Sequence, residues 1–139
     1  PYWSGTWTPV VAGVTTPGTY ELASSNARWQ RAGNMVQVTA NIGLAATITG
    51  GGAGQLAVNG LPFAPRSATA LNWWGTYYQD SIDIPGVYGG MCLVNYANPS
   101  SVFFYTNTDN GAGTTITINN VSANDGLQFS VTYEAEPIT

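Results

Sequence analysis

The sequence predicts an all-β protein, because apolar and polar residues alternate strictly and turn residues recur at short intervals. In residues 36–44, apolar side chains fall on one side of an extended chain and polar side chains or glycine on the other: Val36, Val38, Ala40, Ile42 and Leu44 against Gln37, Thr39, Asn41 and Gly43. Successive strand residues point to opposite faces, so this segment is a half-buried strand. Residues 127–134 repeat the pattern. Short strands between frequent turns are typical of a β-sandwich or barrel.

Strands are expected wherever β-rich segments lie between turn residues. They cover residues 19–23, 27–32, 34–46, 54–60, 67–79, 87–96, 101–107, 114–119 and 127–135. The turns that separate them are, in chain order, Pro17-Gly18, Gly33-Asn34, Gly50-Gly51-Gly52, Asn59-Gly60, Pro85-Gly86, Asn98-Pro99, Asn110-Gly111 and Asp125-Gly126. No segment reads as a helix of useful length, and a chain of 139 residues is expected to form one domain.

The composition of the chain excludes several classes of function. Only 7% of the residues are charged, and lysine and histidine are absent. The basic residues are Arg28, Arg31 and Arg66, against seven carboxylates. Nucleic acid is excluded as a partner because it requires basic patches. Membrane insertion is not expected because there is no long apolar run. A surface of uncharged polar residues and aromatic rings instead favours carbohydrate contact or close packing against sister subunits.

Catalysis, cofactors and metals are not expected in this chain. Without histidine, a serine or cysteine lacks its usual base and zinc lacks a common ligand. Asp80 and Asp83 are three residues apart, so in a strand they face opposite sides and cannot flank one bond. Glu134 and Glu136 read as solvated charges near the terminus. Residues 107–111 read as an Asn/Asp/Gly turn rather than a calcium site, and Cys92 reads as a small buried hydrophobe.

The aromatic segment 72–80 is the candidate binding site. Four rings, Trp73, Trp74, Tyr77 and Tyr78, lie close to the polar side chains of Asn72, Gln79 and Asp80. Adjacent strand residues face opposite sides, so one ring of each pair is expected in the core. The other two lie in a subunit interface or in a sugar-binding surface, where rings stack on sugars and polar groups bond hydroxyls. Such binding would be nearly insensitive to salt.

Three segments together resemble a known family. They are Gly5-Thr6-Trp7-Thr8-Pro9-Val10, then Arg28 to Val38 with Gly33, Val36 and Val38 at fixed spacing, then Val58-Asn59-Gly60-Leu61-Pro62-Phe63. The order is similar to that in a C-terminal module of tail fibres and tailspikes of tailed bacteriophages and their prophage relatives. It spans roughly the first half of the chain. Trp29 and Ala32 stand where the family pattern has a tyrosine and a lysine.

The resemblance implies an antiparallel β-sandwich of jelly-roll type that assembles as a homotrimer at the virion tail tip. It implies that the module holds the trimer together or recognises bacterial surface polysaccharide, with any depolymerase activity in an upstream part of the protein. Residues 1–10 are then expected to form an irregular leading segment, with Trp3 and Trp7 docked on the body or on a neighbour. Residues 11–139 would form the single β-sandwich domain. The alternative is a free-standing, lectin-like glycan-binding domain attached to a hydrolase.

Overall fold

The computed structural model describes residues 2–84, 87, 89–106 and 113–138. Its regular elements are almost all strands: β1 (Tyr2–Thr6), β2 (Val10–Gly13), β3 (Leu22–Ala32), β4 (Met35–Leu44), β5 (Leu56–Asn59), β6 (Asn72–Asp80), β7 (Gly89–Asn95), β8 (Ser101–Thr106), β9 (Thr114–Thr115) and β10 (Gly126–Glu134). Two single-turn 3-10 helices, η1 (Ser67–Thr69) and η2 (Ile118–Asn120), lie in the connections of the described part. The prediction of an all-β fold is therefore confirmed.

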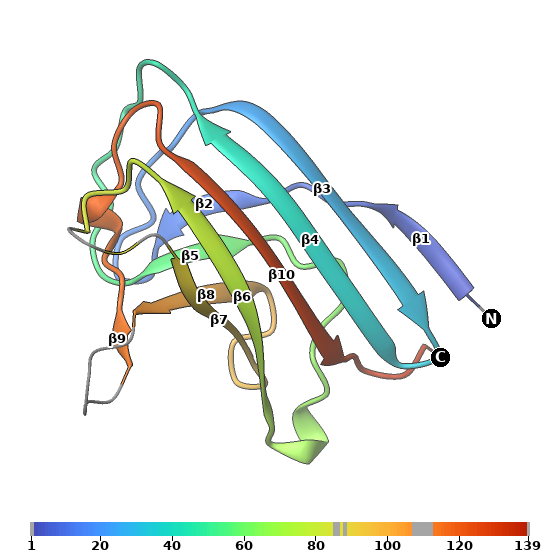
Figure 1. Ribbon diagram of the computed structural model, residues 1–139. Coiled ribbons are helices and arrows are strands. Elements are labelled where there is room, and N and C mark those ends of the chain that lie inside the picture. The colour runs from blue at the N-terminus through green and yellow to red at the C-terminus, as the bar shows by residue number, and fades with distance from the viewer. Residues whose placement is uncertain (1, 85–86, 88, 107–112, 139) are drawn as a thin grey trace.

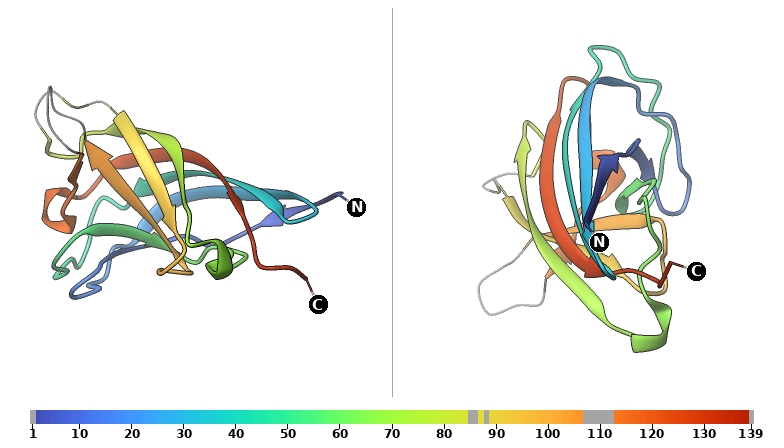
Figure 2. Two further views of the ribbon diagram at one scale, coloured as in Figure 1. Left: turned by 90° about the horizontal axis from the view of Figure 1, so that it is seen from below. Right: turned by 90° about the vertical axis from the view of Figure 1, so that its right-hand side faces the viewer.

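The strands form one antiparallel sheet in the order β1-β3-β4-β10-β6-β7-β8-β5-β2, with β9 paired to β8 (Figure 1). The sheet curls, so that its two halves face each other across one core (Figure 2). Phe129 of β10 meets Phe104 of β8 with ring centroids 5.3 Å apart, and Phe104 also meets Tyr77 of β6 at 5.4 Å. A two-layer sandwich of jelly-roll type and a trimer both stay predictions.

The alternation read from the sequence determines which face of the sheet is buried. Along β4, residues Val36, Val38, Ala40, Ile42 and Leu44 are buried, and the residues between them are exposed or half-buried. Strand β10 shows the same alternation and pairs with β4 from Gly126↔Gly43 to Glu134↔Met35. The two strands therefore present a single apolar face to the core and a single polar face outward.

Strand β3 contains the predicted strand 27–32 and only the last two residues of the predicted strand 19–23, since it begins at Leu22. Strand β3 runs unbroken across Ser24, Ser25 and Asn26, which have low strand propensity. Its pairing with β4 overrides that propensity, and the irregularity is confined to a register shift between Leu22 and Ser24. Predicted strand 67–79 begins only at Asn72, because residues 67–69 form η1 and Ala70 adopts a left-handed conformation (φ 51°).

The prediction of an irregular leading segment is wrong. Residues 2–6 form β1, which pairs with β3 from Tyr2↔Ala32 to Thr6↔Arg28. Gly5 makes this pairing possible, because a Cβ atom there would lie 2.7 Å from the Trp29 ring. An edge strand of this kind is stabilised by its neighbour and needs no alternation of its own.

The two tryptophans of this segment behave differently. Trp7 is 8% exposed, donates from Nε1 to the Arg28 carbonyl at 3.2 Å and packs on Phe129. Its expected docking on the body is thus confirmed. Trp3 is 41% exposed. The boundary between residues 10 and 11 stays a prediction.

Candidate functional site

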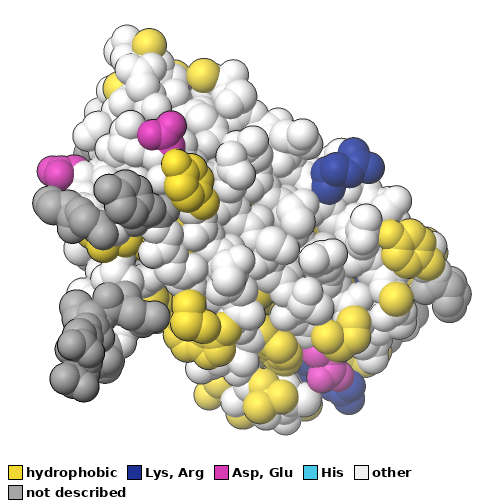
Figure 3. Space-filling model, in the orientation of Figure 1, with side chains coloured by type: hydrophobic (Ala, Val, Ile, Leu, Met, Phe, Trp, Pro, Cys, Tyr) yellow, Lys and Arg dark blue, Asp and Glu magenta, His cyan; other side chains and the backbone are white. Residues whose placement is uncertain are grey.

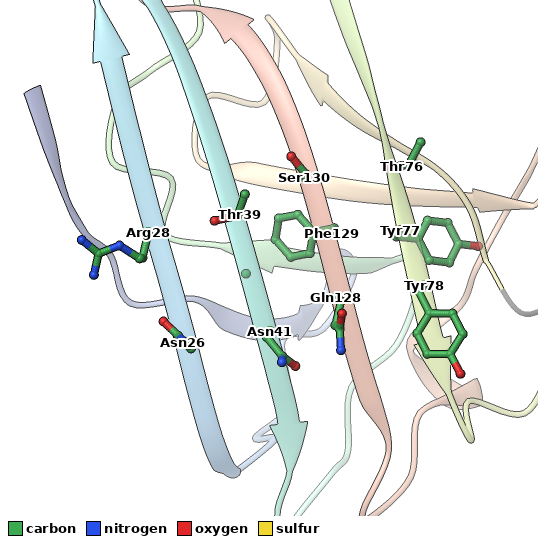
Figure 4. A pocket seen from close by; sticks show the side chains of 11 residues that line it. Asn26, Arg28, Thr39, Asn41, Thr76, Tyr77, Tyr78, Gln128, Phe129 and Ser130 are labelled. Carbon is green, nitrogen blue, oxygen red and sulfur yellow. The ribbon is translucent and has the colours of Figure 1, made fainter. Parts of the chain in front are cut away.

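The outward face of strands β3, β4, β10 and β6 carries two rows of polar side chains. Residues that pair directly across the strands define each row. The first row is Asn26, Asn41, Gln128 and Tyr78, and the second is Arg28, Thr39, Ser130 and Thr76. We call these eight residues the polar platform (Figure 4).

The polar platform lines an open groove of about 500 Å³. Neighbouring strands are about 4.8 Å apart and residues two apart on one strand are about 7 Å apart, so the platform is a grid about 14 Å wide from β3 to β6. Ala40, Tyr77 and Phe129 complete the lining. The space-filling view shows a broad area without charged or apolar side chains over the middle of this face (Figure 3).

Most hydrogen-bond donors and acceptors in the side chains of the polar platform have no partner among the described residues and are accessible to a ligand. Asn26, Asn41 and Gln128 each offer an amide donor and an amide acceptor, and the hydroxyls of Thr39 and Thr76 can do either. Within the described residues, the platform makes one side-chain hydrogen bond, from Gln37 Nε2 to Ser130 Oγ at 3.5 Å. The remaining groups face solvent.

Four of the seven candidate residues of segment 72–80 share this outward face of β6: Asn72, Trp74, Tyr78 and Asp80. Trp74 is 47% exposed and Tyr78 is 53% exposed. The expectation that each aromatic pair divides between the core and the exterior is therefore confirmed. Tyr78 lines the groove of the polar platform.

The other three candidates point inward: Trp73, Tyr77 and Gln79. This corrects the prediction that they belong to a binding site on the surface. Trp73 packs against Tyr133 with ring centroids 6.5 Å apart. The Tyr77 hydroxyl donates to the Tyr105 carbonyl at 3.0 Å.

Gln79 is 6% exposed, and both ends of its amide bond the backbone of the following loop. Its Oε1 accepts from the Ile82 N–H at 2.8 Å, and its Nε2 donates to the Val87 carbonyl. The amide therefore holds the loop after β6 and has no free group for a sugar hydroxyl.

Trp74 lies one outward position beyond Thr76 of the polar platform, about 7 Å farther along β6, and lines a different pocket. It lines a smaller pocket of about 120 Å³ with Met91, Tyr105 and Gly113, and its ring meets the Tyr105 ring edge-on at 5.3 Å. Tyr78 lies four positions after Trp74 on β6, which corresponds to about 14 Å. The aromatic segment therefore contributes to two surfaces, one polar and one apolar.

Of the two carboxylate pairs considered for catalysis, Glu134 and Glu136 have structural partners. Glu134 Oε2 forms an ion pair with Arg66 at 2.7 Å, and Glu136 Oε1 accepts from the Ser67 N–H at 2.6 Å. The buried carboxylate of Asp125 accepts from the Ser122 N–H at 2.6 Å, and burial raises its pKa.

The described residues contain no cluster of three metal-ligating side chains, and none of their helices is long and apolar enough to span a membrane. The proposed turn at 107–111 lies outside the described residues. Cys92 is fully buried, and burial raises its pKa to about 12, so it is the small buried hydrophobe that the sequence predicts.

Sequence reasoning missed most of the polar platform. The alternating pattern identifies the polar positions of β4 and of β10. It does not show that these positions lie side by side in the sheet. Asn41 and Gln128 are directly opposite in the sheet although they lie far apart in the chain. The available signal was the amide and hydroxyl character of the central outward positions, which are Gln37, Thr39 and Asn41 in β4 and Gln128, Ser130 and Thr132 in β10.

Comparison with known proteins gives one structural likeness. No family model matches the sequence, and no curated protein matches it either. The fold is similar to part of the Dettilon tailspike protein (gp208), with a TM-score of 0.72 and 16% sequence identity over 97% of this chain. The chain spans 24% of the length of that tailspike. The likeness shows a shared fold.

Proposed function

We propose that this chain is a module of a bacteriophage tail fibre or tailspike, located at the tail tip, whose polar platform binds bacterial surface glycan. The observation that carries the proposal is the platform itself: a regular grid of amides and hydroxyls, with Arg28 at its β3 side and the Tyr78 ring at its β6 side. Fold likeness to part of a tailspike protein, and the resemblance of its first half to tail-fibre modules, support the tail location.

The chemistry of the platform fits a polysaccharide. Sugar hydroxyls both donate and accept hydrogen bonds, as do the amides of Asn26, Asn41 and Gln128. The exposed ring of Tyr78 offers an apolar surface for the C–H face of a sugar. A shallow, open groove can accept the middle of a long chain without enclosing its ends.

We assign recognition and assembly, not catalysis, to this chain. No carboxylate is among the described residues that line the groove. Any cleavage of the polysaccharide would then belong to other parts of the protein, upstream of this module. Trimerisation is part of the proposal and is consistent with several large apolar side chains that remain exposed, Trp3, Trp74 and Met35 among them.

Calorimetric titration with fragments of bacterial capsular and O-antigen polysaccharides tests the proposal. We expect Tyr78→Ala and Asn41→Ala each to weaken binding about tenfold, as the loss of one ring contact or hydrogen bond would do. Tyr96→Ala is the matched control, because Tyr96 is also exposed but does not line the groove.

Two results would contradict the proposal. One is an absence of binding to every polysaccharide by a folded wild-type protein. The other is binding that Trp74→Ala abolishes while Tyr78→Ala and Asn41→Ala leave it unchanged, which would move the site to the apolar pocket beside Tyr105.

A further inference from the structure

Arg28 differs from Arg31 and Arg66 in that its side chain has no partner among the described residues. Arg31 is 1% exposed; its Nε donates to the Gly33 carbonyl at 2.7 Å and one of its terminal nitrogens to the Glu136 carbonyl at 2.9 Å. Its guanidinium also lies 4.7 Å from the Phe63 ring centroid. Arg31 therefore ties the C-terminal segment to β3.

Arg66 is neutralised by its ion pair with Glu134. The side chain of Arg28 is exposed and forms neither an ion pair nor a hydrogen bond with any described residue. It stands in the second row of the polar platform, directly across from Thr39 on β4 and Thr6 on β1. Figure 4 shows its guanidinium on the side of β3 that faces away from β6.

No described carboxylate of the platform's strands lies close enough to compensate this charge. Two carboxylates lie on the outward face of these strands. Asp80 of β6 is three strands away from β3, or about 14 Å, and Glu134 of β10 is paired with Arg66. The chain carries a net charge of −4, so a cation without a described partner on an otherwise neutral face is against the general trend. Arginine offers a planar fork of donors that matches a carboxylate or phosphate group.

We infer that the polar platform takes an acidic polysaccharide and that Arg28 binds its anionic group, a sugar carboxylate or a phosphate. This inference rests on the proposed function. The glycan then runs across the strands, with a sugar ring on Tyr78 at β6, hydroxyls on Asn41 and Gln128, and the acidic group at β3. Arg28 is the residue that distinguishes an acidic chain from a neutral one of similar shape.

The inference changes the expected salt dependence of binding. Ring stacking and neutral hydrogen bonds alone would make affinity nearly insensitive to salt, as the aromatic segment predicts. One exposed charge pair adds a modest sensitivity, since added salt screens it. The wild-type affinity for an acidic glycan should therefore fall with salt, and the affinity of Arg28→Gln should not.

The test compares acidic polysaccharide fragments with chemically matched neutral ones. Uronate-containing fragments are titrated before and after reduction of their carboxyl groups, and phosphate-containing fragments before and after dephosphorylation. These two arms distinguish the two sources of negative charge. The variants are Arg28→Gln, Arg28→Lys and, as a control with the same change of net charge off the platform, Arg66→Gln. Circular dichroism and light scattering verify the fold and the oligomeric state of each.

We expect removal of the acidic group and Arg28→Gln each to weaken binding by about tenfold to a hundredfold, with no further loss when they are combined. Arg28→Lys should retain part of the affinity, and Arg66→Gln should match the wild type. Equal binding of the acidic and neutral fragments, or an unchanged Arg28→Gln, overturns the inference while the proposed function stands. A failure of wild type to bind any fragment overturns both. Dissociation of an oligomer by Arg28→Gln also overturns the inference, because Arg28 would then be a subunit contact.

Discussion

At the scale of single residues, the core contains two tyrosines whose hydroxyls are used for structure. Tyr133 is fully buried and donates to the Phe63 carbonyl at 2.7 Å, which holds the segment after β5 on β10. Tyr77 is 6% exposed and bonds the Tyr105 carbonyl. Burial raises the pKa of Tyr77 to about 12 and raises that of Tyr133 as well.

These shifts predict how the protein unfolds in alkali. In the unfolded chain a tyrosine ionises near pH 10, whereas the folded protein favours the neutral form of Tyr77 and Tyr133. Their contribution to stability is therefore complete below about pH 10 and is lost as the pH rises toward about 12. We expect part of the phenolate absorbance to appear only together with the loss of the far-ultraviolet circular dichroism signal. Ionisation of all eight tyrosines near pH 10 in a protein that remains folded would contradict this assignment.

At the scale of elements, the two faces of β4 have different roles: one face packs in the core and the other belongs to the polar platform. Val38 is fully buried against the core, and the next residue, Thr39, belongs to the polar platform. The two positions therefore allow the same substitution to be compared on opposite faces of one strand.

We expect Val38→Asp to abolish folding and Thr39→Asp to preserve it. An unpaired carboxylate in the core costs several kcal/mol, which is of the order of the whole stability of a domain. At Thr39 the carboxylate stays in solvent and faces Arg28 across the strand pair. Urea denaturation followed by circular dichroism measures both. If the two variants lose stability alike, the outward face is buried too, and the polar platform is not a free surface.

The strands that could be predicted from the sequence are those whose own residues alternate between apolar and polar. β4 and β10 alternate over their whole length, so their existence and their buried face follow directly. The unbroken course of β3 through Ser24 and Asn26, and the strand formed by residues 2–6, depend on pairing with a neighbour, which no local pattern contains.

The same limit applies to the site. Alternation along β6 shows that one ring of each aromatic pair faces the core, but not which one, because that depends on how β6 aligns with β10. Asn26, Gln128 and Arg28 come together only through the strand order β3-β4-β10-β6, which is not the chain order. The polar platform is therefore a property of the sheet and could not be located from any single segment.

At the scale of the whole molecule, the exposed apolar side chains indicate a further contact surface. Tyr2 and Met35 both pair with Ala32 in neighbouring strands at one end of the outward face, and both are exposed. The exposed side chains of Trp74 and Met91, which line the small apolar pocket, lie on the same molecule. Contact between copies of the chain would cover part of this apolar surface.

We expect light scattering at micromolar concentration to give a mass three times the 14.6 kDa of the chain. Trimerisation would raise the apparent affinity for a long polysaccharide through multivalency, with each single site remaining weak. A monomer that still binds glycan would instead favour a lectin-like domain attached to a hydrolase.

The central claim is that the outward face of β3, β4, β10 and β6 binds glycan, and mapping of backbone amide chemical shifts during a titration tests it most directly. The titrant is a fragment of the bacterial polysaccharide that binds in calorimetry. We predict that the largest shift changes fall on the platform, at Asn26, Arg28, Thr39, Asn41, Tyr78 and Gln128, and that the amides of β5 and β2 do not move. Shift changes centred on Trp74, Met91 and Tyr105, with the platform silent, would contradict the account.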